Sequence, residues 1–419
     1  MRFQKFFHKT RPLNKAIRRA VWPLVMYLGV MGMPSHAAEG GGISDNVIKI
    51  GILNDQSGPY ADLSGMGSVE AARLAIEEMG GSINGKKIEL VWGNHQNKAD
   101  VGAVIARTWF DRDGVDMIAD FSNSSVGFAV QSLAAERDKV VIIAAASSDF
   151  TGKACTNTSA QWVYNSYSNG YGLAKAIAEQ GADTWFLLTV DYAFGHAFAT
   201  DIRGAVTESG GKVLGEVRHP LNAPDLSSFL MQAQSSKAKI IALASAGADM
   251  TNAIKQAREF GITPRQTLIA PTVFLTDIHA MGLQNAQDLK FLTAFYWDRD
   301  EASRAWSKKF FERRKAMPTM TQAGIYSSVR HYLKAVQATK TDKGSVVMEK
   351  MRELPIQDAF SNNGRLRKDG QMIHDMYLVE VKKPSESKGP WDYYKVLQTI
   401  PGEKVFKPLT ASECQLVNK

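Results

Sequence analysis

The stretch VIKIGILNDQSGPYADLSGMGSVEAARLAIEEM (47–79) decides the fold class of this chain. Its first seven residues are mostly apolar and β-branched, and the turn NDQSGPY follows, so they are predicted to form a buried strand. From Ser64 to Met79 apolar residues recur at helical spacing, and Gly80-Gly81 ends the predicted helix. A strand that leads directly into a helix is the first half of a parallel β–α–β unit.

The same alternation continues from residue 86 to residue 272. Further strands are expected at 86–94, 115–121, 140–147, 184–191, 212–220, 238–247 and 266–272. Helices are expected between them, at 99–114, 126–138, 171–181, 195–211, 225–236 and 248–261. The pattern predicts an α/β fold with doubly wound parallel sheets, and two consecutive sets of strands predict two Rossmann-like lobes.

The last third of the chain follows a different pattern. Helices are predicted around 301–317, 322–339 and 344–353, and late antiparallel strands within 370–383 and 391–400. Such returning segments indicate that the chain crosses between the lobes more than once. We therefore assign 38–164 and 295–370 to lobe 1, 165–294 and 371–400 to lobe 2, and 401–419 to a C-terminal tail that returns to lobe 1.

The first 37 residues have the features of a cleavable signal peptide. Residues 1–19 carry seven Lys and Arg residues and no acid, and an apolar run extends from Ala20 to Met33. Ser35 and Ala37 are spaced as the small residues before a cleavage site. The run is shorter than the roughly 20 residues of a membrane span, although an uncleaved anchor is the alternative. We expect an exported, periplasmic protein.

The charge balance argues against a nucleic-acid partner. The chain has 50 Lys and Arg against 42 Asp and Glu, but seven of the bases lie in the leader, so 43 bases face 42 acids after residue 37. The high isoelectric point of about 9.2 therefore belongs largely to the leader.

The two cysteines, Cys155 and Cys414, both lie in the exported part. Thiols in an oxidising compartment usually pair, which predicts a disulfide that ties the C-terminal tail to the loop after residue 150. Two buried free thiols are the alternative.

Sequence motifs of catalysis are absent. The chain has no GxSxG, HExxH, P-loop or GxGxxG motif, and no histidine pair has metal-ligand spacing. His95, His196 and His219 are interpreted as surface or loop residues. We predict a protein that is not an enzyme and has no metal or cofactor.

Several segments in order resemble one known family. These are the opening stretch with INGKKIELV, NSS after the third strand, AAASSD after the fourth, TVDYAFG, and QAREFGI before QTLIAPT. Over about residues 46–405 the chain resembles the branched-chain amino-acid-type periplasmic binding proteins of ABC importers. The resemblance implies a monomer with two lobes joined by three crossovers, a ligand in the cleft between them, hinge closure, and importer permease subunits as partners. Glu70, Glu77 and Glu78 are candidates for docking to the importer, with ordinary solvated helix faces as the alternative.

The first-lobe half of the site is expected where strands run into helix N-termini. Ligands of parallel α/β sheets bind outside the carboxyl ends of the strands. Asn123-Ser124 and Ala146-Ser147-Ser148 are the polar loops at these ends. A helix N-cap is the structural alternative for such residues, whereas the functional interpretation has Ser124 and nearby amides bind a carboxylate. By resemblance, Ala146 and Ser148 match positions that contact the ligand's carboxylate and amino group.

The remaining candidates are aromatic or mark departures from the family. Tyr60 is a candidate lid residue over the ligand, with a turn residue as the alternative. Phe194 matches a family position that contacts the ligand with an aromatic ring, with a core residue as the alternative. Phe274 is a further candidate to line the ligand site. Thr272 stands where amino-acid-binding members carry an acid, and Ala246 where they carry an aromatic residue.

This departure determines the predicted ligand. A buried ammonium without a counter-charge is costly, unless Asp191 or Asp149 replaces the missing acid. The sequence therefore favours an aromatic or other organic acid over an ordinary amino acid. A branched-chain amino-acid binder and a ligand-sensing domain of a signalling system are the alternatives.

Overall fold

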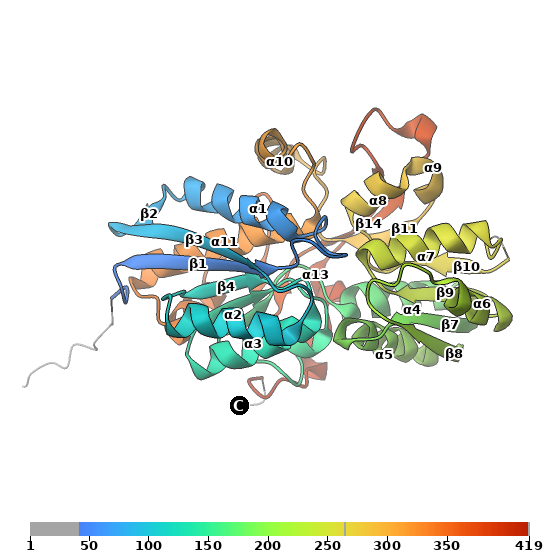
Figure 1. Cartoon of the computed structure of the whole chain (residues 1–419), viewed down its shortest axis with the longest axis horizontal. Coiled ribbons are helices and arrows are strands. Elements are labelled where there is room, and N and C mark those ends of the chain that lie inside the picture. The colour runs from blue at the N-terminus through green and yellow to red at the C-terminus, as the bar shows by residue number, and fades with distance from the viewer. Residues whose placement is uncertain (1–41, 264, 418–419) are drawn as a thin grey trace, which may run out of the picture. The chain divides into compact units, whose positions relative to one another are not determined.

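In the computed structural model, which describes residues 42–263 and 265–417, the strand predicted at 47–53 lies inside a six-stranded sheet (Figure 1). The predicted leader lies outside the described residues. The strand order is β2 (Ser82–Ile83), β3 (Lys86–Asn94), β1 (Val47–Asn54), β4 (Met117–Asp120), β5 (Val140–Ile143) and β6 (Ser159–Gln161). All neighbouring strands are parallel except β2, which forms an antiparallel hairpin with β3.

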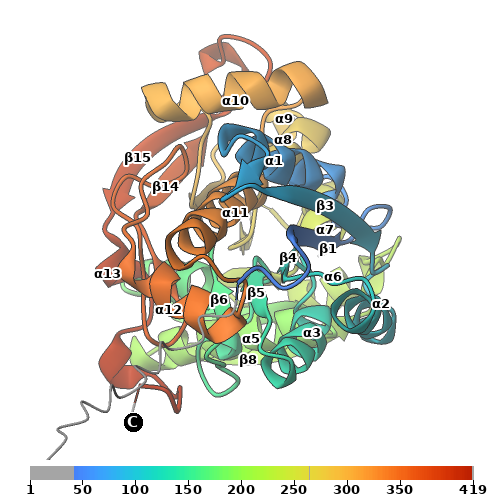
Figure 2. The ribbon, with the colours of Figure 1, turned by 90° about the vertical axis from the view of Figure 1, so that its left-hand side faces the viewer.

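Alternate residues of β1 pack into two different cores, which is why the strand is apolar on both faces. Ile48, Ile50 and Ile52 belong to the core that contains α1 (Gly65–Glu78) and α11 (Met320–Thr339). Leu53 belongs to the opposite core, with α2 (Ala99–Asp111) and α3 (Ser124–Glu136). Figure 2 shows the sheet between these two helix layers. At Gly51 a Cβ atom would lie 2.6 Å from the Trp109 ring, so only glycine lets the indole pack against the strand.

A second lobe is built on a four-stranded parallel sheet. Its order is β10 (Thr267–Ile269), β9 (Ile240–Ala244), β7 (Thr184–Val190) and β8 (Lys212–His219). The connecting helices are α4 (Gly172–Ala178), α5 (Ala193–Glu208), α6 (Ser227–Ser235) and α7 (Gly247–Glu259). The two parallel sheets confirm the predicted two-lobed α/β fold.

The late strands extend the second lobe. β14 (Met376–Val381) and β15 (Tyr394–Ile400) are antiparallel, as expected, and β14 also pairs with β11 (Lys290–Thr293). The short helices α8 (Leu275–Met281) and α9 (Leu283–Ala286) precede β11. Neither of them, nor β6 or β11, was predicted, because elements this short show no clear periodicity.

The segment between β11 and β14 returns to the first lobe. It contains α10 (Glu301–Arg314), α11, α12 (Gly344–Glu353) and the hairpin of β12 (Arg365–Leu366) with β13 (Met372–Ile373). α10 and α11 pack on α1, and Gln371 forms a bridge with Gln161 next to β6. The described chain thus passes between the lobes after β6, after β11 and after β13.

The end of the described chain is fixed to the first lobe by a disulfide. After β15 come α13 (Gly402–Val405) and a short 3₁₀ turn at Leu409–Ala411. Cys414 is buried and bonded to Cys155, 259 positions earlier. This confirms the predicted pairing.

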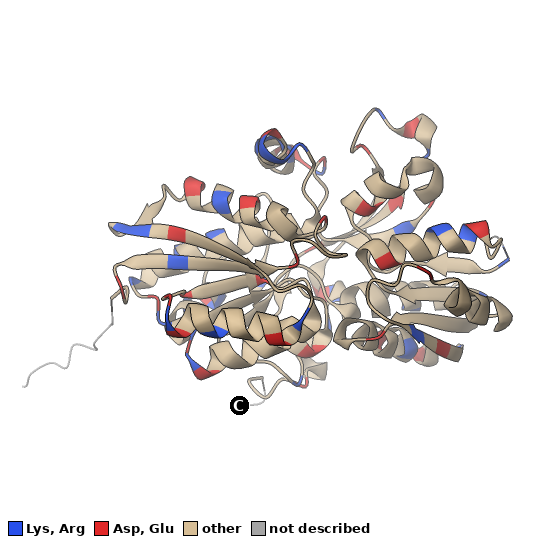
Figure 3. Cartoon of the chain, viewed as in Figure 1, with Lys and Arg blue, Asp and Glu red and all other residues tan. Residues whose placement is uncertain are grey.

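The surface charge is mixed. Figure 3 shows acidic and basic residues interspersed along the same helices and strands, in agreement with the near-neutral balance after the leader. Within the described residues, no helix has the length and apolar character that crossing a membrane requires.

Candidate functional site

The loop between β4 and α3 forms one edge of the first-lobe half of the site. Asn123 is the N-cap of α3, and its Oδ1 accepts hydrogen bonds from the amides of Ser125 (3.0 Å) and Val126 (3.2 Å). The Ser124 hydroxyl accepts from the Ser147 amide at 3.3 Å, which joins the two predicted ligand loops. The Ser124 amide, at the first position of α3, has no acceptor among the described residues.

The loop after β5 is held mainly by its own contacts and by the second lobe. The Ala146 carbonyl accepts from the Ser166 amide at 2.6 Å, whereas the Ala146 amide has no acceptor in the described part of the chain. Ser147 caps the 3₁₀ turn at Ser148–Phe150 by accepting from the Asp149 amide. The Ser148 hydroxyl donates to Asp201 Oδ2 of α5 at 3.0 Å. Ser148 therefore makes a contact between the lobes.

Aromatic side chains from both lobes meet where the lobes face each other. The hydroxyls of Tyr60 and Tyr192 lie 2.7 Å apart, one from each lobe. The ring of Phe194 stacks on Tyr192 at 5.8 Å, and Tyr164 meets Phe274 edge-on at 6.1 Å. Burial raises the pKa of Tyr60 well above its ordinary value, so the phenol stays neutral and can both donate and accept.

The strand ends of the second lobe approach the first lobe closely. Ala246 is buried directly before α7, in the same apolar cluster as Ala146. Gly247 has a φ of 57°, and a Cβ there would lie 2.4 Å from the Pro59 carbonyl oxygen. Glycine is thus required where α7 meets the loop that carries Tyr60.

The acids considered as replacements at the ligand site are engaged on the surface. Asp191 is exposed, and its Oδ1 lies 2.8 Å from His196 Nε2 and 3.8 Å from Arg218. Asp149 pairs with Lys153 at 3.1 Å.

The position expected to carry an acid is uncharged. Thr272 is fully buried, and its hydroxyl has no partner among the described residues. Asp277, which the sequence reasoning missed, follows on α8 and accepts from the Phe274 amide at 2.9 Å. Asp277 is buried, and this burial raises its pKa to about 7. An acidic residue three positions after a helix start was the available signal, but that helix was not predicted.

Two histidines that were expected at the surface or in loops are fully buried. His95 lies in the loop after β3, as the interpretation allowed, whereas His219 is the last residue of β8, so the interpretation is wrong for His219. Their ring nitrogens have polar partners, which makes burial possible: Phe121 and Asn97 for His95, Pro220 and Ser245 for His219. His196 is only partly buried, next to Asp191.

The three glutamates considered for docking are tied to neighbouring helices. Arg313 of α10 bonds Glu70 at 2.8 Å and Glu77 at 2.7 Å. Glu78 accepts from Tyr326 and Arg330 of α11. These contacts show that the three acids link α1 to α10 and α11.

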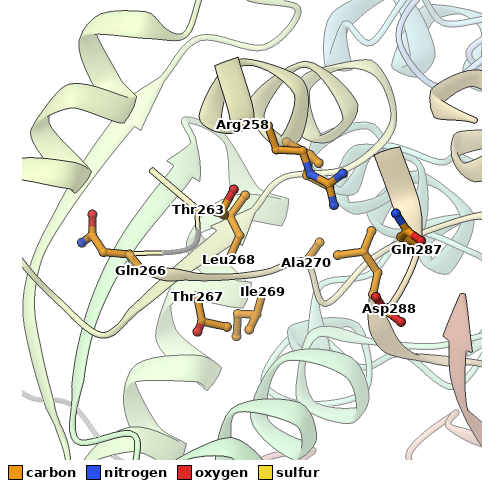
Figure 4. A pocket seen from close by; sticks show the side chains of 11 residues that line it. Arg258, Thr263, Gln266, Thr267, Leu268, Ile269, Ala270, Gln287 and Asp288 are labelled. Carbon is orange, nitrogen blue, oxygen red and sulfur yellow. The ribbon is translucent and has the colours of Figure 1, made fainter. Parts of the chain in front are cut away.

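One small hollow is lined by Ser148 and Asp149 together with residues of the C-terminal tail, whereas another lies away from the predicted site. A groove of about 580 Å³ lies between β10 and the start of β11, with Arg258 and Asp288 among its lining residues (Figure 4). None of its lining residues comes from the first lobe. Within the described residues, no group of three or more His, Cys, Asp or Glu side chains is arranged to hold a metal ion.

Comparison with known proteins gives one family. The family model described as "Periplasmic binding protein" matches residues 47–389. The chain is similar to a periplasmic binding protein from Burkholderia mallei, with 48% identity over 88% of this chain and 99% of that chain and a TM-score of 0.86. It is also similar to a branched-chain amino-acid ABC transporter periplasmic ligand-binding protein from Burkholderia xenovorans, with 40% identity, 88% and 100% coverage, and a TM-score of 0.78.

A more distant likeness concerns the fold alone. An ABC transporter solute-binding protein from R. palustris, in complex with benzoate, has 18% identity, 88% and 100% coverage, and a TM-score of 0.78. The fold, the family match over residues 47–389 and the two structures with 40% or more identity all indicate the same family. The chain belongs to the periplasmic binding protein family, whose members bind solutes and are not enzymes.

Proposed function

We propose that this chain is the exported substrate-binding component of an ABC importer, and that its interlobe cleft takes a small organic acid with an aromatic or other apolar body. In this role the signal peptide directs the chain to the periplasm, the monomer closes on its solute, and the closed form delivers it to the importer permease. Membership of the family and the likeness to two ABC transporter binding proteins support the role in transport.

One observation carries the choice of an acid without an amine. Thr272 is fully buried, its hydroxyl is unpaired, and it stands where the amino-acid-binding members carry a carboxylate. A ligand ammonium at this point would lose its hydration without gaining a counter-charge, which costs several kcal/mol. A carboxylate fits the first-lobe side, where the Ser124 amide at the N-terminus of α3 and the Ala146 amide in the loop after β5 are unengaged.

The aromatic side chains favour an apolar body on the acid. Tyr60, Tyr164, Phe194 and Phe274 belong to one buried cluster with Ala146 and Ala246. Ring faces and edges of this kind pack against aromatic or aliphatic groups, and the Tyr60 and Tyr192 hydroxyls supply polar contacts at their rim. The R. palustris protein that holds benzoate indicates that the fold can accommodate such an acid.

A branched-chain amino-acid binder is the second candidate. The 40% identical B. xenovorans protein is a branched-chain amino-acid ABC transporter periplasmic ligand-binding protein. Asp277 is a buried carboxylate on α8, three residues after Phe274, the N-cap of that helix. Loss of a proton from Asp277 would provide the counter-charge that Thr272 does not.

A thermal-shift screen of matched pairs distinguishes the two candidates. Each pair contains a carboxylic acid and its α-amino counterpart, such as 4-methylpentanoate with L-leucine. A ligand that binds only the folded state raises the melting temperature. We expect stabilisation by acids and little by their amino counterparts. Stabilisation by leucine alone, lost in Asp277→Asn, would establish the second candidate instead.

A further inference from the structure

The backbone that leads to Ser124 has an unusual conformation. Three consecutive residues other than glycine have positive φ angles: Asp120 (92°), Phe121 (73°) and Ser122 (36°). The Asn123 amide donates to the Phe121 carbonyl and closes a three-residue γ-turn around Ser122. Residues held in such regions cost on the order of 1–3 kcal/mol each, so surrounding contacts must maintain the turn.

The side chain of Asp120, which directly precedes this turn, is held from inside the lobe. It is fully buried, and its Oδ2 accepts from Asn54 Nδ2 at 3.0 Å and from the Ser64 hydroxyl at 2.7 Å. Ser64 is the N-cap of α1, so the carboxylate lies at the positive end of that helix. Asn54 also donates to the Gly65 carbonyl at 2.8 Å, which joins β1, α1 and the turn in one network.

His95 holds Phe121, the first residue of the turn. Its Nε2 lies 2.6 Å from the Phe121 carbonyl oxygen, and its Nδ1 accepts from the Asn97 amide at 3.0 Å. The side chain is fully buried, and burial lowers its pKa to about 4. At neutral pH the ring is therefore uncharged, with its proton on Nε2, and it donates to Phe121.

We propose that Asp120 and His95 are positioning residues, which hold residues 120–122 in the positive-φ conformation that presents the Ser124 amide to a ligand. Neither side chain needs to contact the ligand, since each acts through the backbone of the turn. The inference rests on the proposed function in one respect, namely that the Ser124 amide is a donor to the bound carboxylate.

Asp116 offers a matched control on the same strand. Asp116 is also fully buried, and it directly precedes β4, whereas Asp120 is the last residue of that strand. Its carboxylate accepts hydrogen bonds from the Lys49 amide and from Lys139 Nζ, both at 2.9 Å. Asp116→Asn and Asp120→Asn thus remove one buried charge each from opposite ends of β4. Both variants should lower the melting temperature, but only Asp120→Asn should release the turn.

Hydrogen–deuterium exchange of the ligand-free secreted chain tests the inference without any ligand. In Asp120→Asn we expect peptides covering residues 121–126 to exchange at least tenfold faster than in the wild type, with the rest of the sheet little changed. In Asp116→Asn the same peptides should exchange as in the wild type. Equal exchange at 121–126 in the two variants, or a rise spread over the whole sheet, would overturn the proposal.

Calorimetry with 4-methylpentanoate adds the link to binding. His95→Leu cannot donate to the Phe121 carbonyl and should weaken binding at least tenfold, whereas His95→Gln keeps an N–H donor and should restore most of the affinity. Equal losses of affinity in the two variants would show that His95 contributes to core packing only and does not position the turn. If the wild type does not bind this probe, the proposed ligand class is wrong, while the exchange result still decides the positioning role.

Discussion

In the proposed function, Thr272 and Asp277 are the residues that decide which ligand charge the second lobe accepts. The first is neutral, buried and without a hydrogen-bond partner in the described part of the chain, and the second is a buried acid whose pKa is raised by burial. Only the first of these was evident in the sequence, because it occupies a recognisable position after a strand. Asp277 acts from a short helix that periodicity does not reveal.

Asp277→Asn should change how stability depends on pH. The folded-state pKa of about 7 lies above the unfolded value near 4, so between these values the folded chain binds more protons than the unfolded chain. Stability from this group is therefore lost as pH rises from about 4 through 7, by at most roughly 4 kcal/mol. Urea unfolding at pH 4.5 and 7.5 should show a smaller decline in the variant, and an identical decline would refute the assignment.

Thr272→Asp should alter ligand preference. The added carboxylate supplies a counter-charge, so affinity for L-leucine should rise at least tenfold and affinity for 4-methylpentanoate should fall. Fold stability should also fall, since the new charge is buried without a partner in the absence of ligand. Thr272→Val, of similar shape, is the control and should leave ligand preference unchanged. Unchanged preference in the aspartate variant would show that position 272 does not face the ligand.

The elements from residue 47 to residue 272 follow the prediction closely, because long amphipathic helices and buried strands carry strong periodic signals. The polar residues behind the ligand loops were not predicted. Asp120 contacts Asn54, 66 positions away, and Ser148 contacts Asp201, 53 positions away, and no local pattern encodes such pairs. The ligand contacts of Tyr60, Ser124 and Phe194 stay predictions, although Tyr60 and Phe194 lie in one buried apolar cluster.

The disulfide should make a large contribution to stability. It joins the tail to the loop after the 3₁₀ turn at Ser148–Phe150 and closes a very long loop. Cys155→Ser with Cys414→Ser should lower the free energy of unfolding by about 2–5 kcal/mol in denaturant titration. The wild type under a strong reductant should behave like the variant. No loss of stability in either case would contradict this role.

The contact of α10 with α1 should depend more on apolar packing than on charge. Arg313 bridges Glu70 and Glu77, but all three are at the surface, where ion pairs contribute about 0–1 kcal/mol. Phe310 on the same helix is 1% exposed. We expect Phe310→Ala to destabilise the chain by about 3–5 kcal/mol and Arg313→Ala by less than about 1 kcal/mol. The reverse order in denaturant titration would refute this.

At the scale of the whole molecule, the Tyr60–Tyr192 contact links the two lobes directly. Removing both hydroxyls in Tyr60→Phe with Tyr192→Phe leaves no unpaired phenol, so the fold should keep its stability while closure weakens. Small-angle scattering should show a more open ligand-free form than the wild type, and ligand affinity should fall about fivefold, the equivalent of ~1 kcal/mol. Unchanged scattering and affinity would show that this contact does not contribute to closure.

The central claim, that the cleft binds an organic acid and excludes its α-amino counterpart, is tested most directly by calorimetry with 3-phenylpropanoate and L-phenylalanine. The two ligands share a ring and a carboxylate and differ by one ammonium group. We predict at least tenfold tighter binding of the acid, with a negative heat-capacity change from burial of its apolar body. Tight binding of the amino acid and no binding of the acid would contradict the account.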